Sequence, residues 1–440
     1  MNNKIVIRRE DKNPWERRSP LIPTHVRELI HEHAIDIFVQ SSPNRIFADE
    51  DFSREGAEVV DSLAKGSVIF AVKEIPSHLF EHHKVYLFFS HTIKGQPANM
   101  PMLKKMVELE CTLIDYECIL DENGQRLVFF GHQAGQAGMI DTLWTLGQRW
   151  NVLGVPNPFS SIRPAFEYPS LVAAKEEISK VGWAIKNRGL DPNQAPLVCG
   201  FAGYGHVSKG AQDIFSLLPA DELSPGQIKE LFETGRFVSN RLYKVVFKEE
   251  HMVESIGKKR HFDLQDYYDH PERYRSVFHN YLSSLTLLVN CIYWTPQYPR
   301  LVTRKSLERL WTEEGSPRLQ VIGDISCDVE GAIECTIKAT SQAQPVFVFD
   351  PLEGKAVDGC QGRGVAIMAV DNLPAEIPLE SSVFFSQSLK PLVPLIAQAD
   401  FSGSFDHCHL PPSVKKAVIL YRGQFTPEYK YMNNFISTRS

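Results

Sequence analysis

The sequence predicts an α/β protein of two domains, each built on a largely parallel β-sheet. With 440 residues, the chain is long enough for two or three domains of ordinary size. Short apolar runs rich in Val, Ile and Phe alternate with segments of helical periodicity, a pattern typical of parallel sheets covered by helices. Residues 129–140 are rich in small side chains, which predicts close helix packing or a hinge between the two halves.

The predicted elements alternate between strand and helix along the chain. In the first half, strands are expected at residues 4–8, 35–39, 67–72, 84–89 and 112–116, and a helix at 23–33. In the second half, strands are expected at residues 242–247, 287–293, 319–325, 346–349 and 365–370. Residues 250–285 are charged and rich in tyrosine, which indicates an insertion.

A glycine-rich turn follows an apolar strand in the second half and leads into a helix. Gly203 and Gly205 would form the tight turn that lets the backbone approach a pyrophosphate, and His206 and Val207 begin a helix whose N-terminus favours anions. Ser208 replaces the third glycine of the usual fingerprint. The pattern predicts a Rossmann-like dinucleotide site, but a glycine-rich turn without a ligand would look the same.

The choice of coenzyme depends on the end of the next strand, expected at residues 219–225. A carboxylate about 20 residues beyond the glycines binds the ribose hydroxyls of NAD, and its absence leaves room for a 2′-phosphate. If the strand ends at Ser224, the serine faces the adenosine ribose and NADPH fits the site. If the strand ends one or two residues earlier, Glu222 could bind the ribose hydroxyls of NAD. Of the two coenzymes, NADPH is favoured, and NADH remains the alternative.

Ionisable side chains lie at the ends of strands of the first half, where open sheets bind their ligands. They are Arg8, Lys73, His91 and Glu117, each at the end of a predicted strand or within two residues after it. Any one of them alone would be an ordinary solvated loop charge, but charges at four of the five strand ends indicate a site. The last strand of the second half runs into a polar turn, formed by Asp371, Asn372 and Leu373.

Two arginines could bind carboxylates. Arg18 lies in a loop that several prolines hold extended, and Arg126 lies near the end of the first half. A guanidinium can hold a carboxylate with two parallel hydrogen bonds. Ordinary surface ion pairs would explain both residues equally well.

The composition argues against several classes of function. A net charge of −6 gives no basic footprint for nucleic acid, and no segment approaches the apolar length of a membrane span. The N-terminus has no secretory pattern, so a cytoplasmic protein is expected. The eight cysteines and the paired histidines lack the spacing of a disulfide framework or a metal site. The expected partners are small molecules or further copies of the chain in a homo-oligomer.

Seven segments of the chain form a recognisable set: residues 16–21, 72–76, 88–94, 114–117, 290–294, 323–328 and 371–374. Together they resemble lysine-ketoglutarate reductase, a family within the alanine dehydrogenase and saccharopine dehydrogenase superfamily. The resemblance covers nearly the whole chain, and the tyrosine-rich insertion resembles that of the reductase branch of the superfamily.

The resemblance implies an alanine dehydrogenase-like fold with a cleft between two Rossmann-like domains. Residues 1–134 would form the substrate domain, to which residues 376–440 return. Residues 135–375 would form the NAD(P)-binding domain, with its insertion near 250–285. The reaction it implies condenses lysine with 2-oxoglutarate and reduces the imine with NADPH to give saccharopine.

The resemblance also implies roles for individual residues. Lys73 and His91 would carry the proton transfers, and Arg18 and Arg126 would bind substrate carboxylates. Two further residues that line the site would be Lys94 and Glu117. The turn near the nicotinamide would be formed by Asp371, Asn372 and Leu373.

Two alternatives remain open from the sequence. The chain could be a related amino-acid dehydrogenase, such as an alanine dehydrogenase or the NAD-linked saccharopine enzyme. It could also be an NAD(P)-sensing module without catalytic activity, in which Lys73 and His91 have no role.

Overall fold

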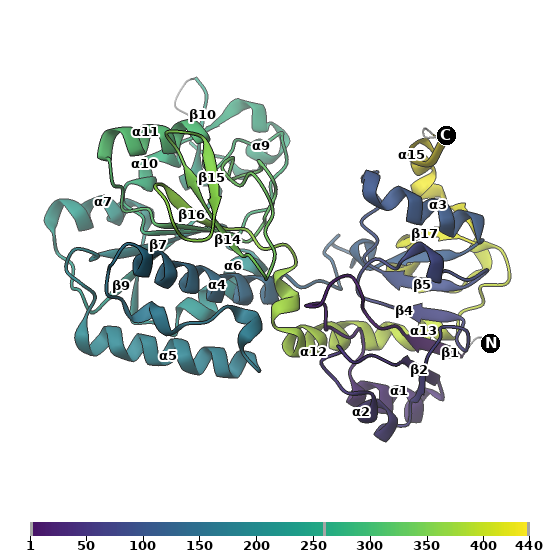
Figure 1. The fold of residues 1–440 in the computed structure, drawn as a ribbon. Helices are drawn as coiled ribbons and strands as arrows, with labels where there is room; N and C mark the ends of the chain where they lie inside the picture. The colour runs from purple at the N-terminus through teal and green to yellow at the C-terminus, as the bar shows by residue number, and fades with distance from the viewer. Residues whose placement is uncertain (1–2, 258–260, 438–440) are drawn as a thin grey trace. The chain divides into compact units, whose positions relative to one another are not determined.

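The computed structural model describes residues 3–257 and 261–437, which form two compact units (Figure 1). Unit 1 consists of Met1–Phe130 and Pro378–Ser440, and unit 2 of Gly131–Ile377. The chain therefore changes unit a few residues away from the boundaries expected at 134 and 376. Each unit contains one mixed, mostly parallel sheet of eight strands, which confirms the predicted α/β class.

Unit 1 is built on the sheet β18-β17-β6-β5-β4-β1-β2-β3. The parallel strands are β1 (Lys4–Ile7), β2 (Asp36–Gln40), β3 (Glu58–Val60), β4 (Val68–Phe70), β5 (Val85–Phe88) and β6 (Thr112–Asp115). The antiparallel edge consists of β17 (Val418–Tyr421) and β18 (Gln424–Phe425). One face packs against α1 (Pro23–His33), α2 (Asp49–Arg54), α12 (Pro378–Leu389), α13 (Val393–Ala397) and α14 (Pro412–Lys416). The other face packs against α3 (Met100–Glu108) and α15 (Asn433–Ser437).

Unit 2 is built on the sheet β15-β14-β16-β13-β12-β7-β9-β8. The parallel strands are β7 (Leu197–Ala202), β8 (Ala220–Leu223), β9 (Leu242–Phe247), β12 (Leu287–Asn290), β13 (Val321–Asp324) and β16 (Val365–Met368). The antiparallel pair consists of β14 (Val346–Asp350) and β15 (Lys355–Asp358). The sheet is therefore mixed, because the strand expected at 346–349 runs against its neighbour.

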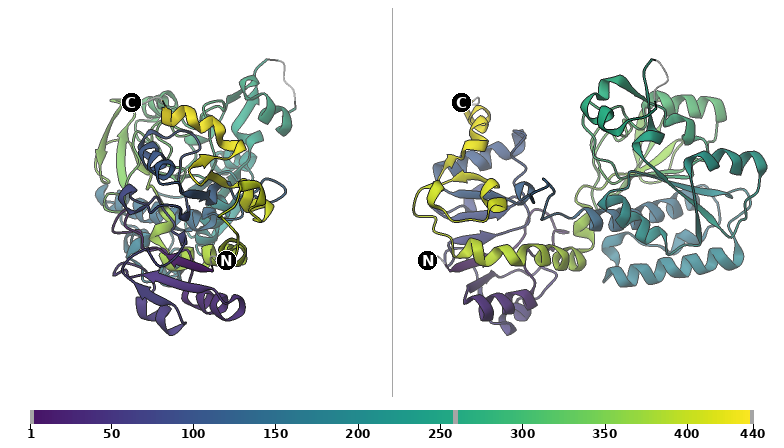
Figure 2. Two further views of the ribbon diagram at one scale, coloured as in Figure 1. Left: turned by 90° about the vertical axis from the view of Figure 1, so that its right-hand side faces the viewer. Right: turned by 180° about the vertical axis from the view of Figure 1, so that it is seen from behind.

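Helices cover both faces of the unit 2 sheet (Figures 1 and 2). One face packs against α4 (Gly131–Val152), α5 (Leu171–Arg188) and α6 (His206–Phe215). The other face packs against α7 (Pro225–Thr234), α10 (His279–Leu282) and α11 (Arg304–Glu314). The predicted insertion adds α8 (Glu249–Met252), β10 (Val253–Ser255), α9 (Leu264–Asp269) and β11 (Tyr274–Ser276), in which β10 and β11 form a separate two-stranded sheet.

The small residues at 129–140 lie mostly in α4 and serve close packing. A Cβ atom on Gly135 would lie 1.9 Å from the carbonyl oxygen of Val207 in α6. A Cβ atom on Gly210, in α6, would lie 2.0 Å from the carbonyl oxygen of His132 in α4. The two helices therefore touch backbone to backbone, and this contact fixes the first turn of α6, next to the glycine-rich turn.

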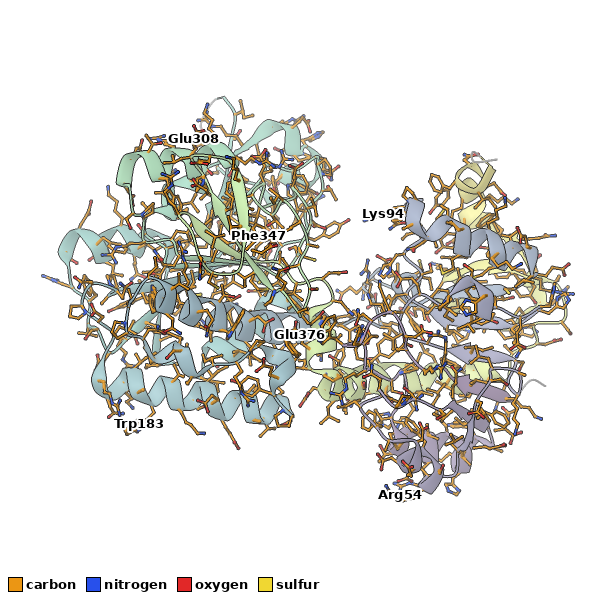
Figure 3. All side chains as sticks on the ribbon, in the orientation of Figure 1. Arg54, Lys94, Trp183, Glu308, Phe347 and Glu376 are labelled. Carbon is orange, nitrogen blue, oxygen red and sulfur yellow. The ribbon has the colours of Figure 1, made fainter. Side chains whose placement is uncertain are left out.

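Two buried carboxyl groups meet inside unit 2. Asp141 of α4 lies beside Glu376, which is labelled in Figure 3. Asp141 Oδ2 and both carboxyl oxygens of Glu376 are buried without a hydrogen-bond partner among the described residues, so a proton held between the two groups would satisfy them. Burial raises the pKa of Asp141 to about 6, and burial together with the Asp141 charge raises that of Glu376 well above its usual range. The folded state therefore holds protons that the unfolded chain loses at lower pH.

We expect this pair to make unit 2 less stable as the pH rises. Its raised pKa values contribute stability that is present below about pH 4 and is lost as the pH rises through about 6. In Glu376→Gln the amide can still donate a hydrogen bond, but it has no proton to lose as the pH rises. The free energy of unfolding of the variant at pH 8 should therefore be higher than that of the wild type by about 1–2 kcal/mol. Urea unfolding at pH 5 to 8 measures the difference, with the exposed α7 carboxylate variant Glu233→Gln as control. Equal curves for Glu376→Gln and wild type would contradict the shared proton.

Candidate active site

In unit 1, a buried carboxyl group holds the turn that carries Lys73. The backbone N–H groups of Val72 and Lys73 donate hydrogen bonds to Glu10, at 2.7 and 3.0 Å. Glu10 is buried, and burial raises its pKa to about 7. Glu10 follows β1, the strand that pairs with β4, and its two hydrogen bonds hold the turn after β4 in place.

Lys73 is a half-buried amine among charged side chains. Burial lowers its pKa, and the positive charges of Arg18 and Lys12 lower it further, whereas Glu74 and Glu16 act in the opposite direction. A lysine with a lowered pKa can both release and accept a proton at moderate pH. The positive charge beside Lys73 comes from an arginine and a lysine, and the proton-transfer role of Lys73 stays a prediction.

His91 is oriented by a carboxylate. Its Nδ1 atom lies 2.6 Å from Glu74 Oε1, and its ring stacks on Phe89 with 6.3 Å between ring centres. Burial alone would raise the pKa of Glu74, but the hydrogen bond and charge of His91, together with Lys12, lower it to about 2. The ionised Glu74 accepts a hydrogen bond from the Nδ1–H group of His91, which leaves Nε2 of His91 as the atom that can exchange protons with a substrate.

A second buried carboxyl group fixes the ends of β5 and β6. Asp115 accepts hydrogen bonds from the backbone and hydroxyl of Ser90 and from the backbone N–H of Glu117. Burial raises the pKa of Asp115 to about 6. His91 follows Ser90 directly, so Asp115 positions both His91 and Glu117.

Arg18 is buried and already holds a carboxylate. Its Nε and Nη2 atoms donate to the two oxygens of Glu16 at 2.7 and 2.6 Å, and its guanidinium lies 4.4 Å from the centre of the Phe130 ring. The sequence predicts that Arg18 binds a substrate carboxylate with two parallel hydrogen bonds, and that role of Arg18 stays a prediction. Its partner in the structure is Glu16, which the sequence analysis did not single out.

The remaining predicted residues of unit 1 differ in exposure. Arg8 is buried and pairs with Asp11 at 2.6 Å, Glu117 is half-buried, and Arg126 and Lys94 are exposed. Arg126 forms an ion pair with Glu117, so these two predicted residues are brought together. Lys94, labelled in Figure 3, is exposed on the turn after β5, where its backbone N–H donates to Gln96. Sequence reasoning missed Glu10, Glu74 and Asp115, for which the only available signal was an acid beside a predicted site residue or strand end.

In unit 2, the glycine-rich turn has the geometry of a phosphate cradle. Gly203 has φ = +95°, which favours glycine, and a Cβ atom there would lie 3.0 Å from Ile292. A Cβ atom on Gly205 would meet nothing within 4 Å, so space is open where a pyrophosphate would approach the N-terminus of α6. Ser208 is buried and accepts a hydrogen bond from Gln212, as suits a small residue at the third fingerprint position.

The other residues predicted to bind the coenzyme are spread along the same sheet. His206 and Val207 form the first turn of α6. The turn after β16 contains Asn372, in the left-handed region with φ = +69°, and Leu373, which packs on α4. Asp371 is exposed. Ser224 follows the edge strand β8 and caps α7 through Gln227, whereas β9 occupies the place beside β7.

Comparison with known proteins places these features in a family. Residues 6–137 match the N-terminal domain of alanine dehydrogenase/PNT, and residues 272–428 match its C-terminal domain. The chain belongs to the alanine dehydrogenase/PNT family. The fold of this family is also found in a solved L-alanine dehydrogenase, with a TM-score of 0.62 and 17% identity over 98% of this chain and 99% of that one. The C-terminal domain of the family is NAD(P)-binding, and the residues that match it include the turn at Asp371, Asn372 and Leu373 but not the glycine-rich turn.

Relatives of this alanine dehydrogenase/PNT chain include two longer proteins. Alpha-aminoadipic semialdehyde synthase of Arabidopsis thaliana is 39% identical over 446 residues, which are 98% of this chain and 41% of that protein. The mitochondrial rat protein of that name is 35% identical over 450 residues, 99% of this chain and 48% of that protein. The chain thus spans less than half of each. Saccharopine dehydrogenase [NAD(+), L-lysine-forming] of Emericella nidulans is 26% identical over 89% of this chain and 91% of that protein.

The part of the chain that the structure describes contains neither a metal centre nor a membrane-spanning helix. Within residues 3–257 and 261–437, no group of His, Cys, Asp and Glu is arranged to hold a metal ion. No helix in the described part of the chain is long and apolar enough to cross a membrane.

Proposed function

We propose that the chain is a lysine-ketoglutarate reductase, which joins lysine to 2-oxoglutarate and reduces the resulting imine to saccharopine with NADPH. The proposal rests on the cluster of Lys73, Glu74 and His91 at the ends of neighbouring parallel strands in unit 1. It is supported by the relatives named above, because their similarity extends over nearly the whole chain. Unit 1 would bind the amino acid and the oxo acid, and unit 2 the coenzyme.

The proposed chemistry needs proton transfers that this cluster can supply. The ε-ammonium of the substrate lysine must lose a proton before its nitrogen attacks C2 of 2-oxoglutarate. The hydroxyl of the resulting carbinolamine must gain a proton before it leaves as water. Lys73, with its lowered pKa, and Nε2 of His91, oriented by Glu74, share these transfers. The bound coenzyme supplies the hydride that reduces the imine.

The substrates carry three carboxylates, so the site needs fixed positive charge. We assign substrate carboxylates to Arg18 and Arg126, and Lys94 and Glu117 would line the site and tune its acid and base groups. Arg18 has the additional effect of lowering the Lys73 pKa, so its charge serves both binding and proton transfer. Arg126 is exposed and forms an ion pair with Glu117. A substrate carboxylate could take the place of Glu117 and form the ion pair with Arg126 instead.

The proposal is tested by following coenzyme oxidation with lysine, 2-oxoglutarate and NADPH, and omitting each in turn. Oxidation should require all three. Oxidation with pyruvate and ammonia in their place would support an alanine dehydrogenase instead, and turnover with NADH but not NADPH would support the NAD-linked alternative. No oxidation with any of these combinations, by a protein that binds NADPH, would support a sensing module.

Arg18→Lys should weaken substrate binding more than coenzyme binding. Lysine keeps the positive charge but cannot form the two parallel hydrogen bonds that hold a carboxylate, and it cannot keep both bonds to Glu16. We expect the KM for 2-oxoglutarate or lysine to rise about tenfold or more and the KM for NADPH to change by less than about twofold. Steady-state kinetics with each substrate varied measures this. A change confined to NADPH would assign Arg18 to coenzyme binding.

A further inference from the structure

The order of strands in unit 2 changes which residue can contact the adenosine ribose. In open α/β sheets, the ribose lies at the end of the strand beside the glycine-turn strand. That strand is β9, because it pairs with β7 along its whole length and β8 is displaced to the edge. The carbonyl of Phe247, at the end of β9, also accepts a 2.9 Å hydrogen bond from the backbone N–H of Gly203. Lys248 and Glu249 follow directly.

A cavity of about 450 Å³ opens at this point between the ends of β9 and β12. It begins at the glycine turn itself, at Gly203 and Gly205, and its far wall belongs to the insertion. Side chains that line it include Tyr204, Glu249, Met252, Tyr268, Ile292 and Tyr298. We call it the tyrosine pocket. Its aromatic wall suits a flat, apolar base with polar edges.

The aromatic side chains of the tyrosine pocket are held in place by one another. Tyr267 lies between Tyr268 and Tyr298, at 5.8 and 5.3 Å between ring centres. The hydroxyl of Tyr268 donates a 2.9 Å hydrogen bond to Glu249. The insertion therefore builds a preformed wall beside the phosphate cradle, which is where the adenine of a dinucleotide would need one.

Lys248 has the charge and position to recognise a 2′-phosphate. Its side chain is exposed, and its ammonium lies 5.9 Å from the centre of the Tyr204 ring, at the rim of the pocket. The neighbouring Glu249, which could otherwise bind ribose hydroxyls, accepts the hydrogen bond from Tyr268. A lysine at the end of this strand attracts a phosphate on the ribose, whereas a carboxylate there would repel it.

We propose that the tyrosine pocket binds the adenosine of the coenzyme and that Lys248 selects the form that carries a 2′-phosphate. This inference rests on the proposed function for the identity of the coenzyme. It moves the selection of the coenzyme away from Ser224, which lies beyond β9 and caps α7.

Calorimetric titration with two fragments, adenosine 2′,5′-bisphosphate and adenosine 5′-monophosphate, tests the proposal on the full chain. Lys248→Ala should raise the Kd of the bisphosphate about tenfold or more and that of the monophosphate by less than about twofold. Tyr204→Ala, which removes an exposed ring, should weaken both fragments by a similar factor. The control Lys229→Ala removes an exposed lysine of α7 and should change neither.

Several results would overturn the proposal. A wild type that binds the monophosphate as tightly as the bisphosphate would remove the role of Lys248, and a Tyr204→Ala variant with unchanged affinities would place adenosine elsewhere. Loss of bisphosphate affinity in Ser224→Asp, with none in Lys248→Ala, would restore selection to Ser224. Because the fragments bind without substrate, the result is separate from turnover. If the protein reduces the lysine imine with NADPH but Lys248→Ala leaves its affinity for the bisphosphate unchanged, this inference is contradicted and the proposed function is not.

Discussion

Lys73→Met and His91→Gln should each lower kcat by about a hundredfold or more, because each removes a group that would carry protons in the proposed reaction. The double variant should lose much less than the product of the two factors, since the groups act as one unit. Lys73→Met should not destabilise the fold. Burying the charged amine of Lys73 costs free energy, and Met removes that charge while it fills a similar volume. Steady-state kinetics between pH 6 and 10 and thermal unfolding of all three variants measure both effects.

The pH dependence provides the internal control for this prediction. A Lys73 amine with a lowered pKa must lose its proton to act as a base, so activity should fall as the pH drops below that pKa. This acid limb should be absent or displaced in the residual activity of Lys73→Met. Near-normal turnover of both single variants across the pH range would show that other groups carry the protons.

Gly135→Ala should destabilise unit 2 by about 3 kcal/mol, although alanine favours helices over glycine. The new methyl group would lie 1.9 Å from the Val207 carbonyl oxygen, so α4 and α6 would have to separate. That separation displaces the first turn of α6, and we expect the Kd for NADPH to rise about tenfold as well. Urea unfolding followed by tryptophan fluorescence is a direct measure, because Trp150 is buried in α4.

Gly226 provides a matched control within the same unit. It lies in helix α7, and a Cβ atom there would meet nothing within 4 Å. Gly226→Ala should therefore gain up to about 1 kcal/mol from helix propensity alone and leave NADPH binding unchanged. If Gly135→Ala stabilised unit 2 as Gly226→Ala does, α4 and α6 would be able to move apart without a loss of unfolding free energy, which would contradict the prediction.

Much of the fold could be predicted because its strands and helices have clear periodicity. The helix at Pro23–His33 and the strand at Leu242–Phe247 begin and end where the sequence predicted. Both are bounded by clear signals, a proline at the first helical position in one case and an apolar run in the other. The antiparallel pair β14 and β15 was not predicted, because an apolar run does not reveal the direction in which a strand runs.

The candidate site could be predicted only in part, because the sequence shows which residues end a strand but not which side chains are buried beneath them. Lys73, His91 and Glu117 follow strands, so the carboxyl-end rule found them. The acids that hold them, Glu10 and Asp115, are buried, and a buried acid looks like any other acid in a sequence. Their role appears only when the hydrogen bonds to neighbouring turns are known.

The order of strands is the feature that the sequence could not provide. The prediction for Ser224 assumed that the second strand of unit 2 lies beside the first, as in the usual Rossmann order. Instead β9 lies there, and β8 is on the edge. Periodicity shows that a strand exists and which face is buried, but lateral order depends on the packing of α6 and α7, which is a tertiary property.

The central claim is that hydride reduces an imine joining lysine to 2-oxoglutarate, and isotope labelling tests it most directly. The enzyme is given lysine with heavy nitrogen at the ε-amine, unlabelled 2-oxoglutarate and NADPH deuterated at the hydride position, and the product is analysed by mass spectrometry. We predict one product that contains both carbon skeletons, the heavy nitrogen between them, and deuterium on the former C2 of 2-oxoglutarate. Deuterium found only in a product that lacks the lysine skeleton would contradict the claim.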